Sequence, residues 1–181
     1  MKFKTTLISS GVAIALPLII GVYRVWPRSE NSGWQVAADV APPGLMMQLA
    51  TDNLAPAFAP QLGQMKMLKP WQSGQTRALY IIDSRTADLT TQDNPLCGAL
   101  GCAFFGYISI ENGFQNVFSL YLDPHLPPDV RLIEASDALH QEMPELVIHQ
   151  LENDQLLQLR LVLNDEQYEV VETQYLPQRD E

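Results

Sequence analysis

Cysteine, histidine and basic residues are all scarce in this sequence, and each scarcity argues against a class of function. The 181 residues include two cysteines, three histidines and eleven lysines or arginines, against 21 acidic residues. A structural zinc site needs four ligands. Besides the cysteines only His125, His140 and His149 could supply them, and their spacing matches no metal motif. We therefore expect no metal site.

The few basic residues are distributed unevenly along the chain. Every acidic residue lies at or after Glu30, where only seven basic residues occur, so this part carries a formal charge of −14 against −10 for the whole chain. A nucleic-acid-binding surface requires a basic patch, and anionic lipid repels an acidic domain. We therefore expect no nucleic-acid partner.

Catalytic sequence motifs are also missing. There is no nucleophile elbow, no phosphate-binding glycine loop and no His-x-x-x-His helix. The carboxylates are scattered through expected turns, and Asp165-Glu166 falls in an expected hairpin loop. The sequence therefore indicates no catalytic or cofactor-binding residue, and we expect no cofactor.

One long uncharged run is present, from Thr5 to Tyr23. As a helix it would span roughly 28 Å, close to the hydrocarbon thickness of a bilayer. We expect residues 1–28 to form an uncleaved membrane anchor, with a transmembrane helix at about 5–23. The alternative is a cleaved signal peptide, for which Ala13-Ile14-Ala15 offers a small-x-small site. Basic and aromatic residues of the kind found at membrane boundaries flank the run: Lys2, Lys4, Arg24, Trp26 and Arg28.

Both interpretations send the chain into a secretory pathway. Residues 29–41 have no hydrophobic period and are expected to be a linker, which leaves residues 42–181 as the folded domain. A cysteine pair is typical of oxidising compartments. We therefore expect a single-pass protein of the cell membrane, with a periplasmic or otherwise extracytoplasmic C-terminal domain.

The secondary-structure patterns predict an α+β domain with one amphipathic helix and a mainly antiparallel sheet of five to seven strands. The helix should follow Pro42-Pro43 and end before Pro56. A buried strand is expected over residues 77–83, after which Asp83 should cap a turn and Arg85 should pair locally.

Two hairpins are predicted in the second half of the chain. The first is made of two β-rich runs, over residues 102–110 and 114–122, joined through Asn112-Gly113, which is a strong hairpin signal. The second run is irregular enough to suggest a bulge. Residues 155–163 and 168–175 form the other hairpin, and residues 146–151 a further strand. Residues 130–140 are ambiguous between a strand and a short helix toward residue 142.

The segment from Cys97 to Cys102 is the most distinctive in the chain. A bent backbone can bring two cysteines five positions apart within disulfide range, and Gly98 and Gly101 supply the freedom that a tight turn needs. We expect a structural disulfide, worth about 2 kcal/mol for so small a ring. A thioredoxin-type redox pair has two intervening residues rather than four, but a redox pair, a metal site and a nucleophilic cysteine remain alternatives.

This Cys-Gly-x-x-Gly-Cys motif, followed by an apolar strand, resembles a pattern in small exported bacterial proteins, with cyanobacterial ones among the longer forms. The resemblance extends over residues 78–83, 95–107 and 121–127, about a third of the chain. Such proteins have no assigned activity, so the resemblance implies no catalytic residue.

We expect a membrane-anchored, non-enzymatic module that binds or assembles with an envelope protein. The anchor, the acidic single domain and the missing catalytic motifs all favour this role. The alternative is a thiol–disulfide redox enzyme or sensor that uses Cys97 and Cys102.

Overall fold

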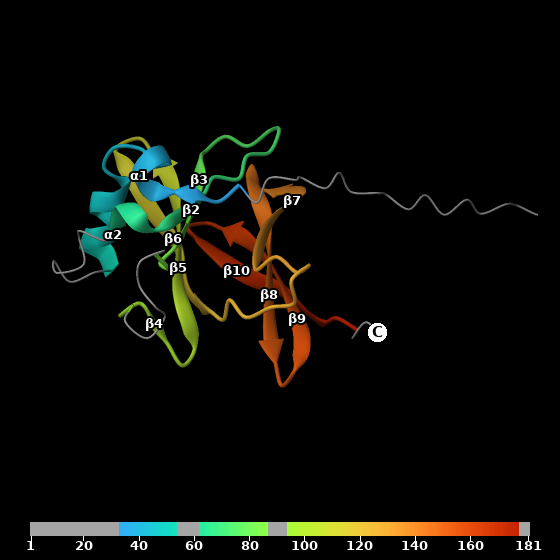
Figure 1. Cartoon of the computed structure of the whole chain (residues 1–181). Helices are drawn as coiled ribbons and strands as arrows, with labels where there is room; N and C mark the ends of the chain where they lie inside the picture. The colour runs from blue at the N-terminus through green and yellow to red at the C-terminus, as the bar shows by residue number, and fades with distance from the viewer. Residues whose placement is uncertain (1–32, 54–61, 87–93, 178–181) are drawn as a thin grey trace, which may run out of the picture. The chain divides into compact units, whose positions relative to one another are not determined.

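The computed structural model describes residues 33–53, 62–86 and 94–177, and in these ranges the chain forms ten strands and two short helices (Figure 1). Every pairing between strands is antiparallel. The first half of the chain contributes β1 (Gln35–Val36), α1 (Ala37–Val40), α2 (Leu45–Asn53), β2 (Lys66–Leu68), β3 (Leu79–Asp83) and β4 (Cys97–Gly98). The second half contributes β5 (Gly101–Ile110), β6 (Gly113–Leu122), β7 (Ile133–His140), β8 (Met143–Glu152), β9 (Gln155–Asn164) and β10 (Gln167–Tyr175).

The first sheet, sheet A, has the order β1-β2-β3-β5-β4, and β6 also pairs with β5. At its centre, all five residues of β3 are buried, as an apolar β-favouring run requires. The β5–β6 hairpin turns through Glu111-Asn112, with Ile110 paired to Gly113, and its register shifts between Gly106 and Tyr107. A Cβ on Gly106 would lie 2.2 Å from the Phe118 ring, so only glycine lets that ring lie across β5. The predicted hairpin and its bulge are thus confirmed.

The second sheet, sheet B, has the order β10-β9-β8-β7 and is built from consecutive hairpins. The turn between β7 and β8 is Gln141-Glu142, and the turn between β8 and β9 is Asn153-Asp154. All four residues have positive φ. Two such residues in a two-residue loop define the type I′ turn, whose twist matches that of the flanking strands. The β8–β9 and β9–β10 hairpins include the strands predicted over residues 146–151, 155–163 and 168–175.

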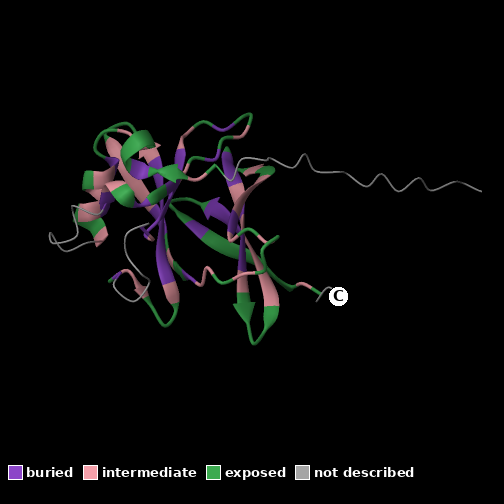
Figure 2. Ribbon diagram, in the orientation of Figure 1, coloured by how far each residue is buried: buried purple, intermediate pink, exposed green. Residues whose placement is uncertain are grey.

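Buried side chains cover both faces of sheet A, because side chains alternate between the two faces along each strand. On one face, residues such as Ile81 and Phe104 pack against residues of sheet B such as Leu146 and Leu161. On the other face, residues such as Ile82 pack against Leu45 and Leu49 of α2 and against α1. Figure 2 shows this burial along the middle of the strands.

The expected fold class, an α+β domain behind a transmembrane helix, is wrong. In the described ranges the helices contain only four and nine residues, and the strands form two antiparallel sheets rather than one of five to seven strands. None of the described helices is long and apolar enough to cross a membrane. The expected anchor over residues 1–28 lies outside the described residues.

One smaller expectation also needs correction, and one segment that was left open is now assigned. The expected linker over residues 29–41 contains β1 and α1, and Ala37 is fully buried, so the folded unit begins before residue 42. The ambiguous segment over residues 130–140 contains the strand β7, because its apolar residues pair with those of β8. The amphipathic helix was correctly predicted as α2, which begins two residues after Pro43.

Candidate functional site

The disulfide between Cys97 and Cys102 is present, which confirms the expected bond. The two cysteines face each other as paired residues of β4 and β5, with Cα atoms 3.9 Å apart. Cys102 is only 1% exposed, whereas Cys97 is half-buried. Cys97 is therefore the more accessible residue of the pair.

The two glycines of the motif differ in their roles. Gly98 and Gly101 pair with each other and close a loop formed by Ala99 and Leu100. Gly101 has φ of +101°, and a Cβ on it would lie 2.2 Å from the carbonyl oxygen of Leu122. A Cβ on Gly98 would meet no atom within 4 Å. Only Gly101 is therefore required by the structure.

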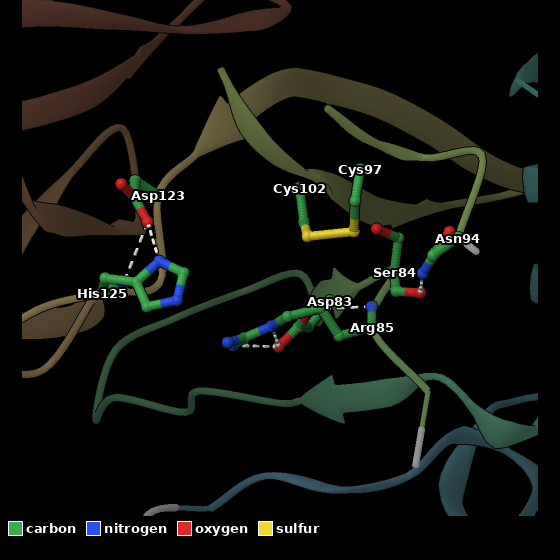
Figure 3. A network of polar contacts seen from close by, with 8 residues as sticks. All are labelled: Asp83, Ser84, Arg85, Asn94, Cys97, Cys102, Asp123 and His125. Carbon is green, nitrogen blue, oxygen red and sulfur yellow. Dashed lines mark hydrogen bonds and ion pairs between the residues drawn. A yellow bond between two sulfur atoms is a disulfide. The ribbon is translucent and has the colours of Figure 1, made fainter. Parts of the chain in front are cut away.

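The entry to the turn is anchored by the buried side chain of Asn94 (Figure 3). Its amide Nδ2 donates to the carbonyl of Ser84 at 2.9 Å, and its Oδ1 accepts from the backbone N–H of Leu96 at 2.9 Å. Leu96 in turn accepts from the Ala103 N–H at 2.8 Å. These hydrogen bonds thus fix the turn to the end of β3 at one side and to β5 at the other, independently of the disulfide.

A hollow of about 480 Å³ lies beside the disulfide. Its rim includes Asp123 and His125, whose Oδ1 and Nδ1 atoms lie 2.6 Å apart. The backbone N–H of His125 donates to the same oxygen at 2.9 Å, and this bond is the main reason that the pKa of Asp123 is lowered. The His125 side chain is 83% exposed, as expected of a loop residue.

A second hollow, of about 320 Å³, is lined by six residues: Trp34, Lys66, Asp83, Arg85, Phe104 and Leu132. The Asp83 side chain is only 2% exposed and accepts from Nε of Arg85 at 2.9 Å through both oxygens. Its Oδ1 also accepts from the backbone N–H of Arg85 at 3.0 Å. The predicted turn cap and local pairing at Asp83 and Arg85 are therefore confirmed.

The remaining histidines do not join a site. The buried His149 has Nδ1 2.7 Å from the carbonyl of Arg131 and Nε2 3.1 Å from the amide of Gln158, so it is held as a core residue. His140 ends β7, next to the turn at residues 141–142. In the described ranges, no three His, Cys, Asp or Glu residues gather closely enough to hold a metal ion.

The buried hydroxyl of Ser84 has no hydrogen-bond partner among the described residues, but Ser84 does not line the first hollow. The Ser84 N–H donates to the Ala103 carbonyl, which extends the β3–β5 pairing by one residue. Because side chains alternate along paired strands, Ser84 and Ala103 point to the face opposite Cys102. No described nucleophile therefore joins His125 at the first hollow.

The sequence did not indicate Trp34 or Lys66 as site residues, because Trp34 fell in the expected linker and Lys66 in no predicted helix or strand. Lys66 and Asp83 face each other across β2 and β3, a pairing between distant parts of the chain. The one available signal was that basic residues are rare after Glu30. No protein-family model, curated protein or solved structure matches the chain.

Proposed function

We propose that the chain is a non-enzymatic binding module of an extracytoplasmic compartment, and that it contacts a protein of the cell envelope through the β4–β5 turn. The observation that carries this proposal is Leu100, which is 77% exposed at the tip of the turn. The disulfide, Gly101 and the Asn94 hydrogen bonds fix the backbone on both sides of it.

A fixed apolar residue is well suited to binding because little conformational entropy is lost when a partner orders it. Single exposed apolar residues are common on protein surfaces. Leu100 differs from those because it stands on a covalently closed turn beside a hollow of about 480 Å³. Apolar anchors beside pockets dominate the energetics of protein interfaces. The disulfide itself favours an oxidising compartment.

Photo-crosslinking in cells tests this proposal. A photoreactive amino acid replaces Leu100 in the full chain, and the matched control carries it at Met47 of α2, which is 75% exposed. We expect one discrete crosslinked protein from position 100 and none from position 47. Equal labelling at both positions, or no adduct at either, would contradict the proposal.

Thiol–disulfide exchange is the second candidate, favoured by the position of Cys97 on the rim of the first hollow. An incoming thiolate would attack the Cys97 sulfur, and the S–S bond would break with Cys102 leaving as the thiolate. A second thiol would then release the mixed disulfide, leaving two cysteine thiols and an oxidised donor pair. Thiol trapping in intact cells tests this: a reduced fraction that changes with the thiol supply supports exchange, whereas an invariant disulfide contradicts it.

A further inference from the structure

We propose that the second hollow, between Lys66 and Arg85, binds a small carboxylate that carries an apolar group. This inference goes beyond the proposed function, because it concerns a different hollow and a small ligand instead of a partner protein. It rests on the fixed position of Arg85, the charge of Lys66 and the apolar residues beside them.

Arg85 is held in place before any ligand arrives. Nε and Nη2 donate to the buried carboxylate of Asp83, at 2.9 Å and 2.5 Å, and the guanidinium lies 5.6 Å from the centre of the Phe104 ring. Its Nη1 donates to no described residue. A guanidinium with one edge fixed by an acid and no described partner on the other edge is preorganised for a second carboxylate.

Lys66 supplies a second positive charge to the same hollow. It is exposed and lies directly opposite Asp83 in the β2–β3 pairing, so the two side chains share a face of sheet A. Both Asp83 oxygens are bonded to Arg85, and Lys66 forms no ion pair with any described residue. Its ammonium group is therefore available to an anion.

The charge of the hollow is opposite to that of the chain around it. The hollow contains two positive side chains, Lys66 and Arg85, and one negative side chain, Asp83, so its formal charge is +1. The chain from Ser29 onward carries a formal charge of −14. A singly charged anion matches this excess, whereas a dianion would exceed it by one negative charge. The surrounding acidic surface repels polyanions, so the hollow favours small monoanions.

Half of the residues that line the hollow are apolar. Trp34 packs edge-on against Phe104, with ring centres 6.3 Å apart, and Leu132 lies on the same hollow half-buried. The volume of about 320 Å³ is at the lower end of the range for small-molecule sites. Two cations beside an indole and a leucine suit a carboxylate attached to an aromatic or aliphatic body.

A titration of the full chain with 3-phenylpropionate, followed by NMR at the indole N–H of Trp34, tests the proposal. The comparison ligands are 3-phenylpropanol, which lacks the charge, and acetate, which lacks the apolar body. The peptide acetyl-Gly-Gly-Phe distinguishes a free acid from a protein C-terminus, which offers the same chemistry. The variant is Lys66→Gln, and the matched control is Lys69→Gln, an exposed lysine near the end of β2 that does not line the hollow.

We expect saturable shifts at Trp34 with 3-phenylpropionate or with the peptide. The unaltered chain should bind the alcohol and acetate about tenfold more weakly, and the Lys66→Gln variant should bind 3-phenylpropionate about tenfold more weakly. Lys69→Gln should bind like the unaltered chain. Arg85 is left unchanged, because its removal would leave Asp83 buried and unpaired. Equal binding of acid and alcohol, equal loss in both lysine variants, or no saturable shift with either acid would overturn the proposal. None of these results bears on crosslinking at Leu100, so the two proposals fail separately.

Discussion

Gly101 lies against the main chain of Leu122 so closely that a Cβ at this position would be 2.2 Å from the Leu122 carbonyl oxygen. The residue also has φ of +101°, which side-chain-bearing residues rarely adopt. The start of β5 therefore fits against the end of β6 only if residue 101 is glycine. The exposed turn that carries Leu100 depends on this contact as well as on the disulfide.

Gly101→Ala should lower the free energy of unfolding by about 2 to 4 kcal/mol, since it adds both backbone strain and overlap with the Leu122 main chain. Gly98→Ala is the matched control, because a Cβ there meets nothing within 4 Å, and it should cost less than about 0.5 kcal/mol. Urea denaturation of both variants measures the difference. Equal stabilities would show that the contact does not constrain the turn.

Removing the disulfide, by Cys97→Ala with Cys102→Ala, should lower the free energy of unfolding by about 2 kcal/mol, because the bond closes a ring of only six residues. The two sheets do not depend on the bond, so the circular dichroism spectrum of the folded state should be unchanged. Urea denaturation gives the energy, and reduction of the unaltered chain should give a similar loss. A collapse of the whole fold on reduction would contradict this prediction.

Tyr107→Phe should destabilise the attachment of α2 to sheet A. The buried phenol of Tyr107 donates to Asp52 at 3.0 Å and accepts from Nδ2 of Asn53 at 2.8 Å. Losing these bonds should lower the free energy of unfolding by about 1 to 2 kcal/mol. It should also speed amide hydrogen exchange in α2 more than in the rest of the chain. Tyr121→Phe, at a residue that is 55% exposed, is the control and should change neither measurement.

Stability should fall as the pH rises above about 10. Burial raises the pKa of the phenols of Tyr107 and Tyr168 above the ordinary value of 10.0, and the hydrogen bond to Asp52 adds to the effect at Tyr107. Both groups keep their protons in the folded chain where the unfolded chain has lost them. Unfolding therefore releases protons, and the stabilisation present below pH 10 is lost as the pH rises.

Urea midpoints measured between about pH 8 and about pH 11 test this dependence. Tyr168→Phe should flatten the decline, although it also removes a 2.8 Å hydrogen bond to the Pro144 carbonyl and lowers stability at pH 8. Tyr121→Phe should leave the slope unchanged. An identical slope in Tyr168→Phe and in the unaltered chain would refute the role of the buried phenol.

Local signals predicted much of the secondary structure. The prolines before α2, the Asn112-Gly113 turn and the alternating leucines of β9 each act within a few residues, and all three elements form as predicted. The strand count was too low because β1, β2 and β4 contain only two or three residues each. Such short strands exist only through pairing with a neighbour and leave no periodic pattern in the sequence.

The sequence by itself determined the disulfide turn, because Cys97, Cys102 and Gly101 lie close enough together for ring closure to be a local matter. Only the tertiary structure decided the rest of the fold. It formed two sheets in place of one, folded a segment where a linker was expected, and brought Trp34, Lys66 and Arg85 together at one hollow. The physical reason is that burial and strand pairing join residues far apart in the chain. No single stretch of sequence encodes those contacts.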